Sequence, residues 1–142
     1  MVIIRLNPTD YHRFHFPCNC KASKSKLING YLYSVNPFAI FKNYKIFKQN
    51  KRVLTILETK KFGKILFVEI GATAVGSITQ TFSAEKKYLK GGQKGYFSFG
   101  GSSIVMLFEK NKIKFDEEFL KMTKRNIEVL SMFGKKLGKI SK

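Results

Sequence analysis

The 142-residue sequence has no tryptophan, two cysteines, three prolines and only nine acidic residues. None of its apolar runs approaches the roughly 20 residues that a membrane-spanning helix requires. Its first residues lack the charged start and the longer apolar core of a secretory signal peptide. Cys18 and Cys20 are one residue apart, and a disulfide across so short a gap would be strained. We therefore expect a cytoplasmic protein with free thiols.

The scarcity of acids leaves a formal net charge of +18. The excess is uneven, because residues 21–64 hold eleven Lys or Arg side chains and a single acid, Glu58. Such a surface attracts polyanions, either nucleic acid or anionic lipid. Base readout and base stacking favour arginine and aromatic side chains, whereas lysine dominates here. The composition therefore favours a lipid surface, and we expect no nucleic-acid partner.

Short apolar runs separated by glycine predict a mostly β (α+β) fold, a β-rich sandwich or barrel-like domain with few short helices. We expect one domain over residues 1–142. Polar, charged loops are expected at 18–28 and 83–92, a short helix or turn at 38–50, and a helix capped by Asp116 that ends near Arg125. The expected strands are 1–6, 31–35, 52–59, 65–70, 72–82, 96–99, 104–108 and 127–133.

The segment Gly100-Gly101-Ser102-Ser103 lies between two of the predicted strands. The simpler interpretation is a β-turn. The alternative is a strained turn in which a serine hydroxyl attacks the backbone carbonyl before it, since glycine permits dihedral angles closed to other residues. A phosphate-binding loop is a further possibility at the glycine pairs Gly91-Gly92 and Gly100-Gly101. Neither pair has the spacing of the known phosphate-binding motifs.

The only two histidines, His12 and His15, lie in one aromatic hexapeptide. Histidine is the usual general acid or base near neutral pH, although packing against the neighbouring phenylalanines would also explain the pair. With Cys18 and Cys20 the histidines could form a metal site. Four ligands within nine residues are too crowded for a structural zinc site, so we predict no metal.

A serine nucleophile with a histidine base is a further hypothesis, because catalytic triads are defined by geometry and not by sequence order. Ser102 would be the nucleophile. A triad also needs a carboxylate to orient the histidine, and acids are scarce. Asp10 and Glu69 are the candidates.

Five motifs in this chain resemble those of the pyruvoyl-dependent phosphatidylserine decarboxylases, in the same order over nearly the whole sequence. Residues 5–17 resemble the family signature RLxPxDYHRxHxP, and residues 34–37 its SVNP segment. Residues 50–53 resemble NxRV, residues 68–78 the GAxxVGSI strand pair, and residues 91–108 the KGxEKGYFxFGGST stretch.

The resemblance implies a β-rich fold with a lipoyl-like hybrid core and a self-made cofactor. In the family, the serine at the position of Ser102 attacks the carbonyl of the preceding glycine, here Gly101. Cleavage then leaves a pyruvoyl group at residue 102. Residues 1–101 would become the β chain and residues 102–142 the α chain.

The same resemblance implies decarboxylation of phosphatidylserine to phosphatidylethanolamine in phospholipid biosynthesis. The pyruvoyl carbonyl takes the substrate amine and acts as the electron sink. By the resemblance His15 is the base of self-cleavage, and His12 assists decarboxylation or protonation. We expect phosphatidylserine and an anionic membrane surface as partners, and a peripheral location on the cytoplasmic side of the cell membrane.

The chain departs from the family in one important respect. The family's triad aspartate lies upstream of the histidine signature, and this sequence starts just before that signature. Asp10 belongs to the signature and is no substitute. The resemblance therefore implies a separate N-terminal segment that supplies the aspartate. The alternative is a catalytically silent fragment that acts as a basic membrane-binding or RNA-binding module.

Overall fold

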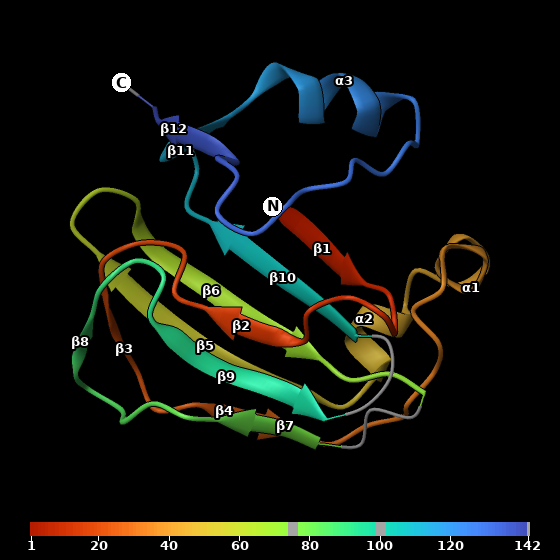
Figure 1. The fold of residues 1–142 in the computed structure, drawn as a ribbon, viewed down its shortest axis with the longest axis horizontal. Helices are drawn as coiled ribbons and strands as arrows, with labels where there is room; N and C mark the ends of the chain where they lie inside the picture. Colours follow the sequence, from red (N-terminus) through yellow and green to blue (C-terminus); the bar gives the residue numbers. More distant parts are fainter. Residues whose placement is uncertain (74–76, 99–101, 142) are drawn as a thin grey trace.

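The structure, a computed structural model, describes residues 1–73, 77–98 and 102–141. Figure 1 shows two facing β-sheets, with a β-ribbon and a helix at one end of the molecule. The helices are α1 (Pro37–Lys42), α2 (Ile46–Gln49) and α3 (Glu117–Lys124). The strands are β1 (Val2–Leu6), β2 (Arg13–His15), β3 (Cys20–Ala22), β4 (Lys26–Ile28), β5 (Arg52–Thr59), β6 (Gly63–Ile70), β7 (Ser77–Gln80), β8 (Lys87–Tyr88), β9 (Gln93–Ser98), β10 (Ser102–Phe108), β11 (Ile113–Phe115) and β12 (Gly138–Ile140). None of the helices in these ranges has the length and apolar composition that crossing a bilayer requires.

A seven-stranded antiparallel sheet forms the larger layer. Its strand order is β1-β10-β6-β5-β3-β8, and β4 also pairs with β5. The longest hairpin joins β5 to β6, with Arg52 opposite Ile70 and Thr59 opposite Gly63. Gly63 turns the chain with a φ of +67°, a left-handed conformation that glycine adopts without a Cβ clash. This sheet carries one end of the candidate site, because Ser102 is the first residue of β10.

The smaller sheet, β2-β9-β7, lies over one face of the larger sheet (Figure 1). The ring centroid of Phe14 on β2 lies 6.4 Å from that of Phe67 on β6 and 5.0 Å from that of Phe97 on β9. A Cβ at Gly95 would lie 2.6 Å from the Phe14 ring, so glycine is needed for β9 to approach β2 here. The buried core cluster consists of Phe14, Phe16, Cys20, Ala22, Leu57, Ile65, Phe67, Phe97, Ile104 and Met106.

The opposite face of the larger sheet carries a second apolar cluster. Val68, Ile70 and Val105 are buried there, and Phe47 of α2 packs against them. The chain after α3 returns towards β1, where the Glu128 carboxylate accepts hydrogen bonds from the Arg5 guanidinium at 2.6 and 2.9 Å. Strand β1 is therefore held both by β10 and by the C-terminal segment.

The prediction of a mostly β fold with few short helices is confirmed. The strands expected at 1–6, 52–59, 65–70 and 104–108 correspond to β1, β5, β6 and β10. Helix α3 follows Asp116 as expected, and α1 and α2 occupy the segment 38–50. The strand expected at 96–99 is β9 as far as Ser98, and the one at 72–82 is β7. Phe99 and residues 74–76 lie outside the described residues. A lipoyl-like core stays a prediction.

The loops expected at 18–28 and 83–92 are wrong in part, since they contain β3, β4 and β8. The lysines in 18–28 suggested full exposure. Lys21 instead alternates with Cys20 and Ala22, whose side chains are buried in the core, so one face of this short strand is apolar. Strand β3 is paired on both sides, with β5 and with β8, so this segment is part of the larger sheet.

Two predicted strands do not form. The backbone N–H and carbonyl of Tyr33 bind the side chain of Asn50, at 3.1 and 2.7 Å, so the segment 31–35 uses a side chain where a strand would use a neighbour. Segment 127–133 makes single side-chain contacts instead of a ladder, through Glu128 to Arg5 and through Phe133 to His15.

Both cysteines are free thiols, and burial raises the pKa of the Cys20 thiol to about 11, with a smaller contribution from Cys18. Only the thiolate reacts, and roughly one Cys20 side chain in a thousand is a thiolate at pH 8. We expect iodoacetamide to label Cys20 in the native protein far more slowly than in urea, with the rate rising steadily towards pH 10. Peptide mass spectrometry measures this rate, and labelling as fast as in urea would contradict the assignment.

Candidate active site

His12 lies just before β2, beside the end of β9. Its backbone carbonyl accepts a hydrogen bond from the N–H of Phe97 at 2.9 Å, and its ring meets the Phe97 ring edge-on. His12 Nδ1 lies 2.6 Å from the carbonyl oxygen of Asp10. A carbonyl only accepts, so Nδ1 carries the hydrogen, and Nε2 of the neutral ring is the basic nitrogen. This Nε2 is buried and has no hydrogen-bond partner among the described residues.

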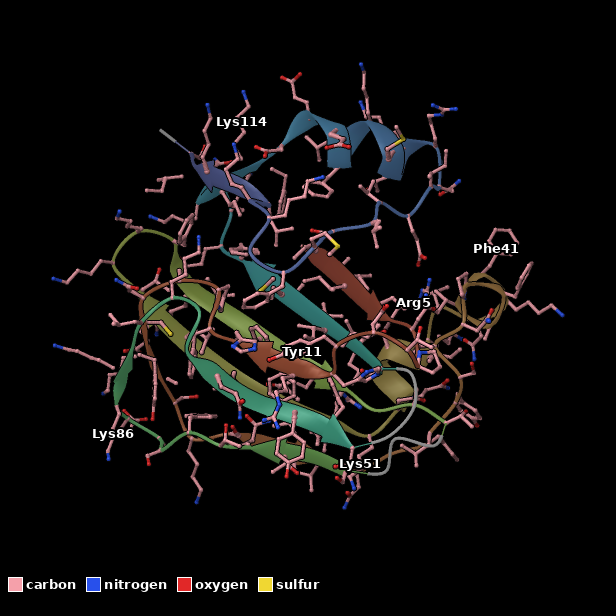
Figure 2. The ribbon with its side chains drawn as sticks, in the orientation of Figure 1. Arg5, Tyr11, Phe41, Lys51, Lys86 and Lys114 are labelled. Atoms are coloured by element: carbon pink, nitrogen blue, oxygen red, sulfur yellow. The ribbon has the colours of Figure 1, made fainter. Side chains whose placement is uncertain are left out.

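His15 lies at the other end of β2, opposite Gln93, after a bulge that follows Phe14. Its Nδ1 donates to the carbonyl oxygen of Gly91 at 2.9 Å. Its Nε2 therefore accepts from the hydroxyl of Tyr11 at 3.0 Å. Figure 2 labels Tyr11 over β2. Tyr11 stacks on the His15 ring and Phe133 tilts against it, with ring centroids 5.7 and 4.7 Å away. Both ring nitrogens of His15 are thus engaged.

Ser102 begins β10, and its side chain is fully buried. It pairs with Leu6 of β1. Alternation along the strand places Ser102 on the same face as Ile104 and Met106, which line the core between the two sheets. Ser102 Oγ has no hydrogen-bond partner within the described ranges, and neither has the equally buried Oγ of Ser103. An unpaired buried hydroxyl costs about 1–3 kcal/mol, so this arrangement needs an explanation.

The two sheets bring His12 and Ser102 to the same end of the molecule. Strand β9 runs past His12 to Ser98, and β10 starts at Ser102, four residues further along the chain. Figure 1 shows the end of β9 and the start of β10 at the same end of the sheets. His15 lies further back along β9. Gly101, the expected cleavage partner, lies outside the described residues, as do Phe99 and Gly100.

A buried ion pair crosses the core between the sheets. Lys94 of β9 donates to Glu69 of β6 at 2.5 Å, to Gln80 of β7 at 2.6 Å and to Thr55 of β5 at 2.9 Å. Lys94 and Glu69 have no exposed side-chain surface. Burial lowers the pKa of Lys94 and raises the pKa of Glu69, while their mutual attraction opposes both shifts. All three donors of the Lys94 ammonium are used.

The sequence did not single out Lys94, although a signal was present. Glu69 is the only acid in a buried apolar strand, and such a carboxylate requires a cation nearby. The rings of Phe14, Phe67 and Phe82 also surround the ammonium, at 4.8–5.6 Å from their centroids. These contacts favour the charged form of the lysine.

Neither candidate carboxylate orients a histidine. Asp10 uses its carboxylate to accept the N–H of Asn7 at 2.7 Å, and it holds His12 through its backbone carbonyl instead. Glu69 is bound to Lys94, although its Oε2 has no partner among the described residues. Glu69 lies opposite Ile104, so it shares the core face with Ser102. In the described part of the chain, the candidate nucleophile and the candidate bases have no carboxylate bound to a histidine.

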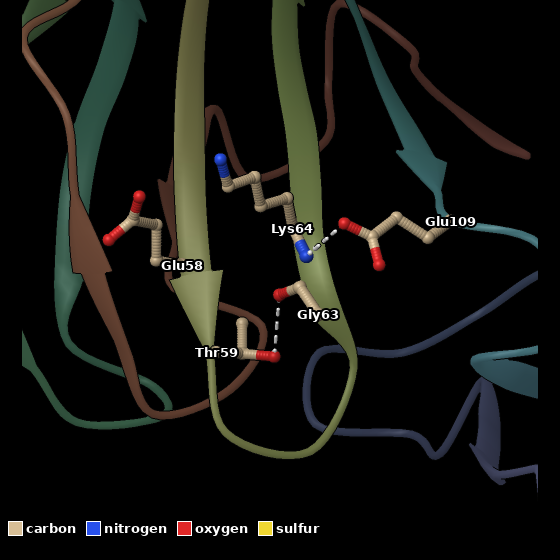
Figure 3. A pocket seen from close by; sticks show the side chains of 5 residues that line it. All are labelled: Glu58, Thr59, Gly63, Lys64 and Glu109. Atoms are coloured by element: carbon tan, nitrogen blue, oxygen red, sulfur yellow. Dashed lines mark hydrogen bonds between the residues drawn. The ribbon is translucent and has the colours of Figure 1, made fainter.

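Hollows elsewhere on the surface do not contain these groups. A pocket of about 300 Å³ lies at the β5–β6 turn, lined by Glu58, Thr59, Gly63, Lys64 and Glu109. Figure 3 shows its polar groups closing the turn: Thr59 donates to the Gly63 carbonyl at 2.9 Å and the Lys64 N–H donates to Glu109 at 3.1 Å. The described residues include no group of three or more His, Cys, Asp or Glu side chains placed to hold a metal ion.

A buried serine hydroxyl and a buried, unpartnered imidazole nitrogen at the same end of the two sheets define a candidate site in a β-rich fold. Comparison with known proteins identifies its family. A family model described as phosphatidylserine decarboxylase matches residues 1–137. The chain therefore belongs to the phosphatidylserine decarboxylase family.

Similar proteins in several bacteria carry the name phosphatidylserine decarboxylase proenzyme. The Chlamydia caviae protein is 50% identical over 139 residues, which cover 98% of this chain and 46% of that protein. The Chlamydia pneumoniae protein is 48% identical over the same shares, and the Clostridium tetani protein is 49% identical over 97% of this chain and 46% of its own length. The chain thus spans about half the length of the curated relatives it matches.

Proposed function

We propose that this chain is the self-processing part of a pyruvoyl-dependent phosphatidylserine decarboxylase, cut between Gly101 and Ser102. The observation that carries the proposal is the buried, unpaired hydroxyl of Ser102 at the start of β10. A nucleophile must keep its hydroxyl available. The Ser103 hydroxyl is equally unpaired among the described residues. Ser102 is the proposed nucleophile because it directly follows Gly101 and shares the face of Ile104 and Met106 in the core between the sheets. The resemblance of residues 91–108 to the family's KGxEKGYFxFGGST stretch supports the choice of this residue.

The proposed cleavage needs no external reagent other than water. The Ser102 hydroxyl attacks the Gly101 carbonyl, and the acyl group moves from nitrogen to oxygen. Elimination leaves Gly101 with a free carboxylate and residue 102 as dehydroalanine. One water then enters and one ammonia leaves, so that residue 102 ends as a pyruvoyl group. Residues 1–101 form the larger chain and residues 102–142 the smaller one.

The surroundings of Ser102 suit a pyruvoyl group. The group would supply the electron sink for loss of carbon dioxide from phosphatidylserine, yielding phosphatidylethanolamine. Ile104 and Met106 share the face of Ser102 and are buried, so they keep water from the reacting centre. His12 presents a basic Nε2 to the same core, where it can hold or return a proton.

The histidines take separate roles in this proposal, as the family resemblance implies. His15 is the base of self-cleavage and His12 serves the decarboxylation. Tyr11 bonds to His15 Nε2, so Tyr11 must move or relay the proton when His15 acts. Since neither Asp10 nor Glu69 contacts a histidine, the orienting carboxylate would come from a separate segment, equivalent to the part of the relatives that this chain does not match. The assembled protein would lie peripherally on the cytoplasmic side of the membrane.

Single histidine variants should separate the two roles. His15→Ala should leave the chain uncut, because no base deprotonates Ser102. His12→Ala should still be cut but should form phosphatidylethanolamine at least about 100-fold more slowly, the usual contribution of a general acid or base. Denaturing gels measure cleavage and thin-layer chromatography measures the product. The opposite pattern, with cleavage lost only in His12→Ala, would exchange the roles.

The function is tested by phosphatidylethanolamine formation from phosphatidylserine vesicles. The chain is expressed alone and together with the unmatched part of the Chlamydia caviae protein. The proposal expects product in the combined sample. Vesicle or RNA binding without cleavage or product in either sample would favour the alternative, a basic binding module whose affinity falls steeply with salt.

A further inference from the structure

We propose that α1 is a membrane-docking element that inserts Phe38 and Phe41 into an anionic lipid bilayer. These side chains are 82% and 90% exposed, more than any other aromatic side chain among the described residues. They are three residues apart on the helix, so they occupy one face. Figure 2 shows Phe41 at the outer edge of the molecule. Two adjacent, fully exposed phenylalanines expose a large apolar area to water, which requires a functional reason.

The helix is firmly attached on its other side. Pro37 occupies its first turn, and the Asn36 side chain caps it by accepting the N–H of Phe38 at 3.0 Å. Ala39 and Ile40 pack against a small buried cluster of Val35, Ile46 and Ala72. The fold therefore buries the smaller apolar side chains of α1 and presents the two larger ones to solvent.

Positive charge follows the two phenylalanines along the chain. Lys42, Lys45 and Lys48 are exposed on α1, α2 and the turn between them, and the sequence has no acid between Asp10 and Glu58. Each lysine near an anionic leaflet contributes about 1 kcal/mol of attraction. Tyr44, 72% exposed, adds a side chain suited to the boundary between lipid and water. Exposed apolar side chains with exposed lysines directly after them in the chain match the chemistry of an anionic bilayer.

A protein partner is the rival occupant, and the charges argue against it. Lysine is depleted at protein–protein interfaces, whereas aromatic residues are enriched there. Here lysines and aromatic residues alternate within one short segment, an arrangement that a bilayer satisfies because the lysines stay at the headgroups. The choice of lipid rests on the proposed function, in which the substrate is itself a membrane lipid.

Vesicle sedimentation tests the docking surface. We expect the chain to bind vesicles of phosphatidylcholine that contain roughly 30% phosphatidylglycerol, because anionic lipid attracts basic segments. Vesicles of phosphatidylcholine alone should bind weakly. The double variant Phe38→Ser/Phe41→Ser should bind at least about tenfold more weakly, as expected for two apolar side chains that are no longer inserted. Lys45→Glu should weaken binding about tenfold and flatten its salt dependence.

Matched controls come from another part of the surface. Leu89 is 74% exposed near β8, and Figure 2 shows Lys86 on the opposite side of the molecule from Phe41. Leu89→Ser and Lys86→Glu make the same changes in side-chain type and charge, and they should alter vesicle binding by less than about twofold if α1 is the docking element. If the α1 variants and their controls lost vesicle binding equally, binding would not depend on α1, and the proposal would be overturned.

Two further outcomes would also overturn it. One is unchanged vesicle binding by Phe38→Ser/Phe41→Ser. The other is that this variant keeps vesicle binding and loses its association with the unmatched part of the Chlamydia caviae protein, which would make α1 a protein interface. Cleavage at Ser102 is scored in parallel samples that also contain the unmatched part of the Chlamydia caviae protein, and the α1 variants should keep it. Absence of cleavage of the unaltered chain in those samples would count against the proposed function alone, because vesicle binding is measured separately.

Discussion

Ser102→Ala should leave the chain as one uncut polypeptide under conditions in which the unaltered chain is cleaved. Alanine fits the buried site, since it removes only a hydroxyl that has no hydrogen-bond partner among the described residues. The variant should therefore be as stable as the parent or slightly more so, because a buried unpaired polar group is removed. Without the hydroxyl no acyl shift from Gly101 can begin, so cleavage should fall below detection on a denaturing gel.

Ser103→Ala is the matched control for this prediction. Ser103 is as buried as Ser102 and lies opposite Ile70 on the adjacent strand. Its hydroxyl likewise has no partner in the described parts of the chain. Cleavage should survive this change, because alternation directs Ser103 to the other face of the sheet. Cut chains in Ser102→Ala would remove Ser102 as the nucleophile. Loss of cleavage in Ser103→Ala alone would transfer the role to Ser103.

Lys94→Met should destabilise the fold by about 3–5 kcal/mol, the usual result of removing one partner of a buried ion pair. Methionine keeps most of the side-chain volume, so the loss reports the uncompensated carboxylate of Glu69 and not a cavity. Urea unfolding followed by circular dichroism measures the change. The double variant Lys94→Met/Glu69→Leu should recover most of the stability, since apolar replacement of both partners is often neutral.

The pH dependence of Lys94→Met gives an independent check. Burial raises the pKa of Glu69, and the nearby Lys94 ammonium is the main influence that lowers it. Removing the ammonium should therefore raise the pKa of Glu69 further. A carboxyl whose folded pKa lies above its unfolded value favours the folded state at low pH and opposes it as the pH rises past the unfolded value. The loss of folding stability caused by Lys94→Met should therefore be smaller at pH 5 than at pH 8. An equal deficit at both pH values would show that Glu69 is not the origin of the loss.

The sequence predicted the long elements well because their local pattern and their packing agree. Strand β5 alternates apolar and polar residues, and α3 begins after an acidic residue and has two more in its first turn. The failures come from residues whose partners are distant in the chain. Segment 31–35 looks like a strand, yet Asn50 occupies its hydrogen-bonding groups. Such a replacement depends on tertiary contacts that local propensity does not contain.

The candidate site was predictable in its residue types and not in its pairing. Ser102 and the two histidines follow from the sequence. Their different environments do not: His12 Nε2 is unpartnered in the described structure, whereas His15 is bonded to Tyr11 and covered by Phe133, more than a hundred residues further along the chain. The binding of Glu69 to Lys94 likewise required the packing of two sheets.

Intact-mass spectrometry tests the central claim most directly, namely that residue 102 becomes a pyruvoyl group. The chain is analysed alone and after expression with the unmatched part of the Chlamydia caviae protein. The account predicts, in the combined sample, a fragment of residues 102–142 that is lighter by one ammonia than the same peptide beginning with serine. It also predicts a fragment ending at Gly101 with a free carboxylate. A single uncut chain of 16.3 kDa in both samples, or a smaller fragment that begins with intact serine, would contradict the account.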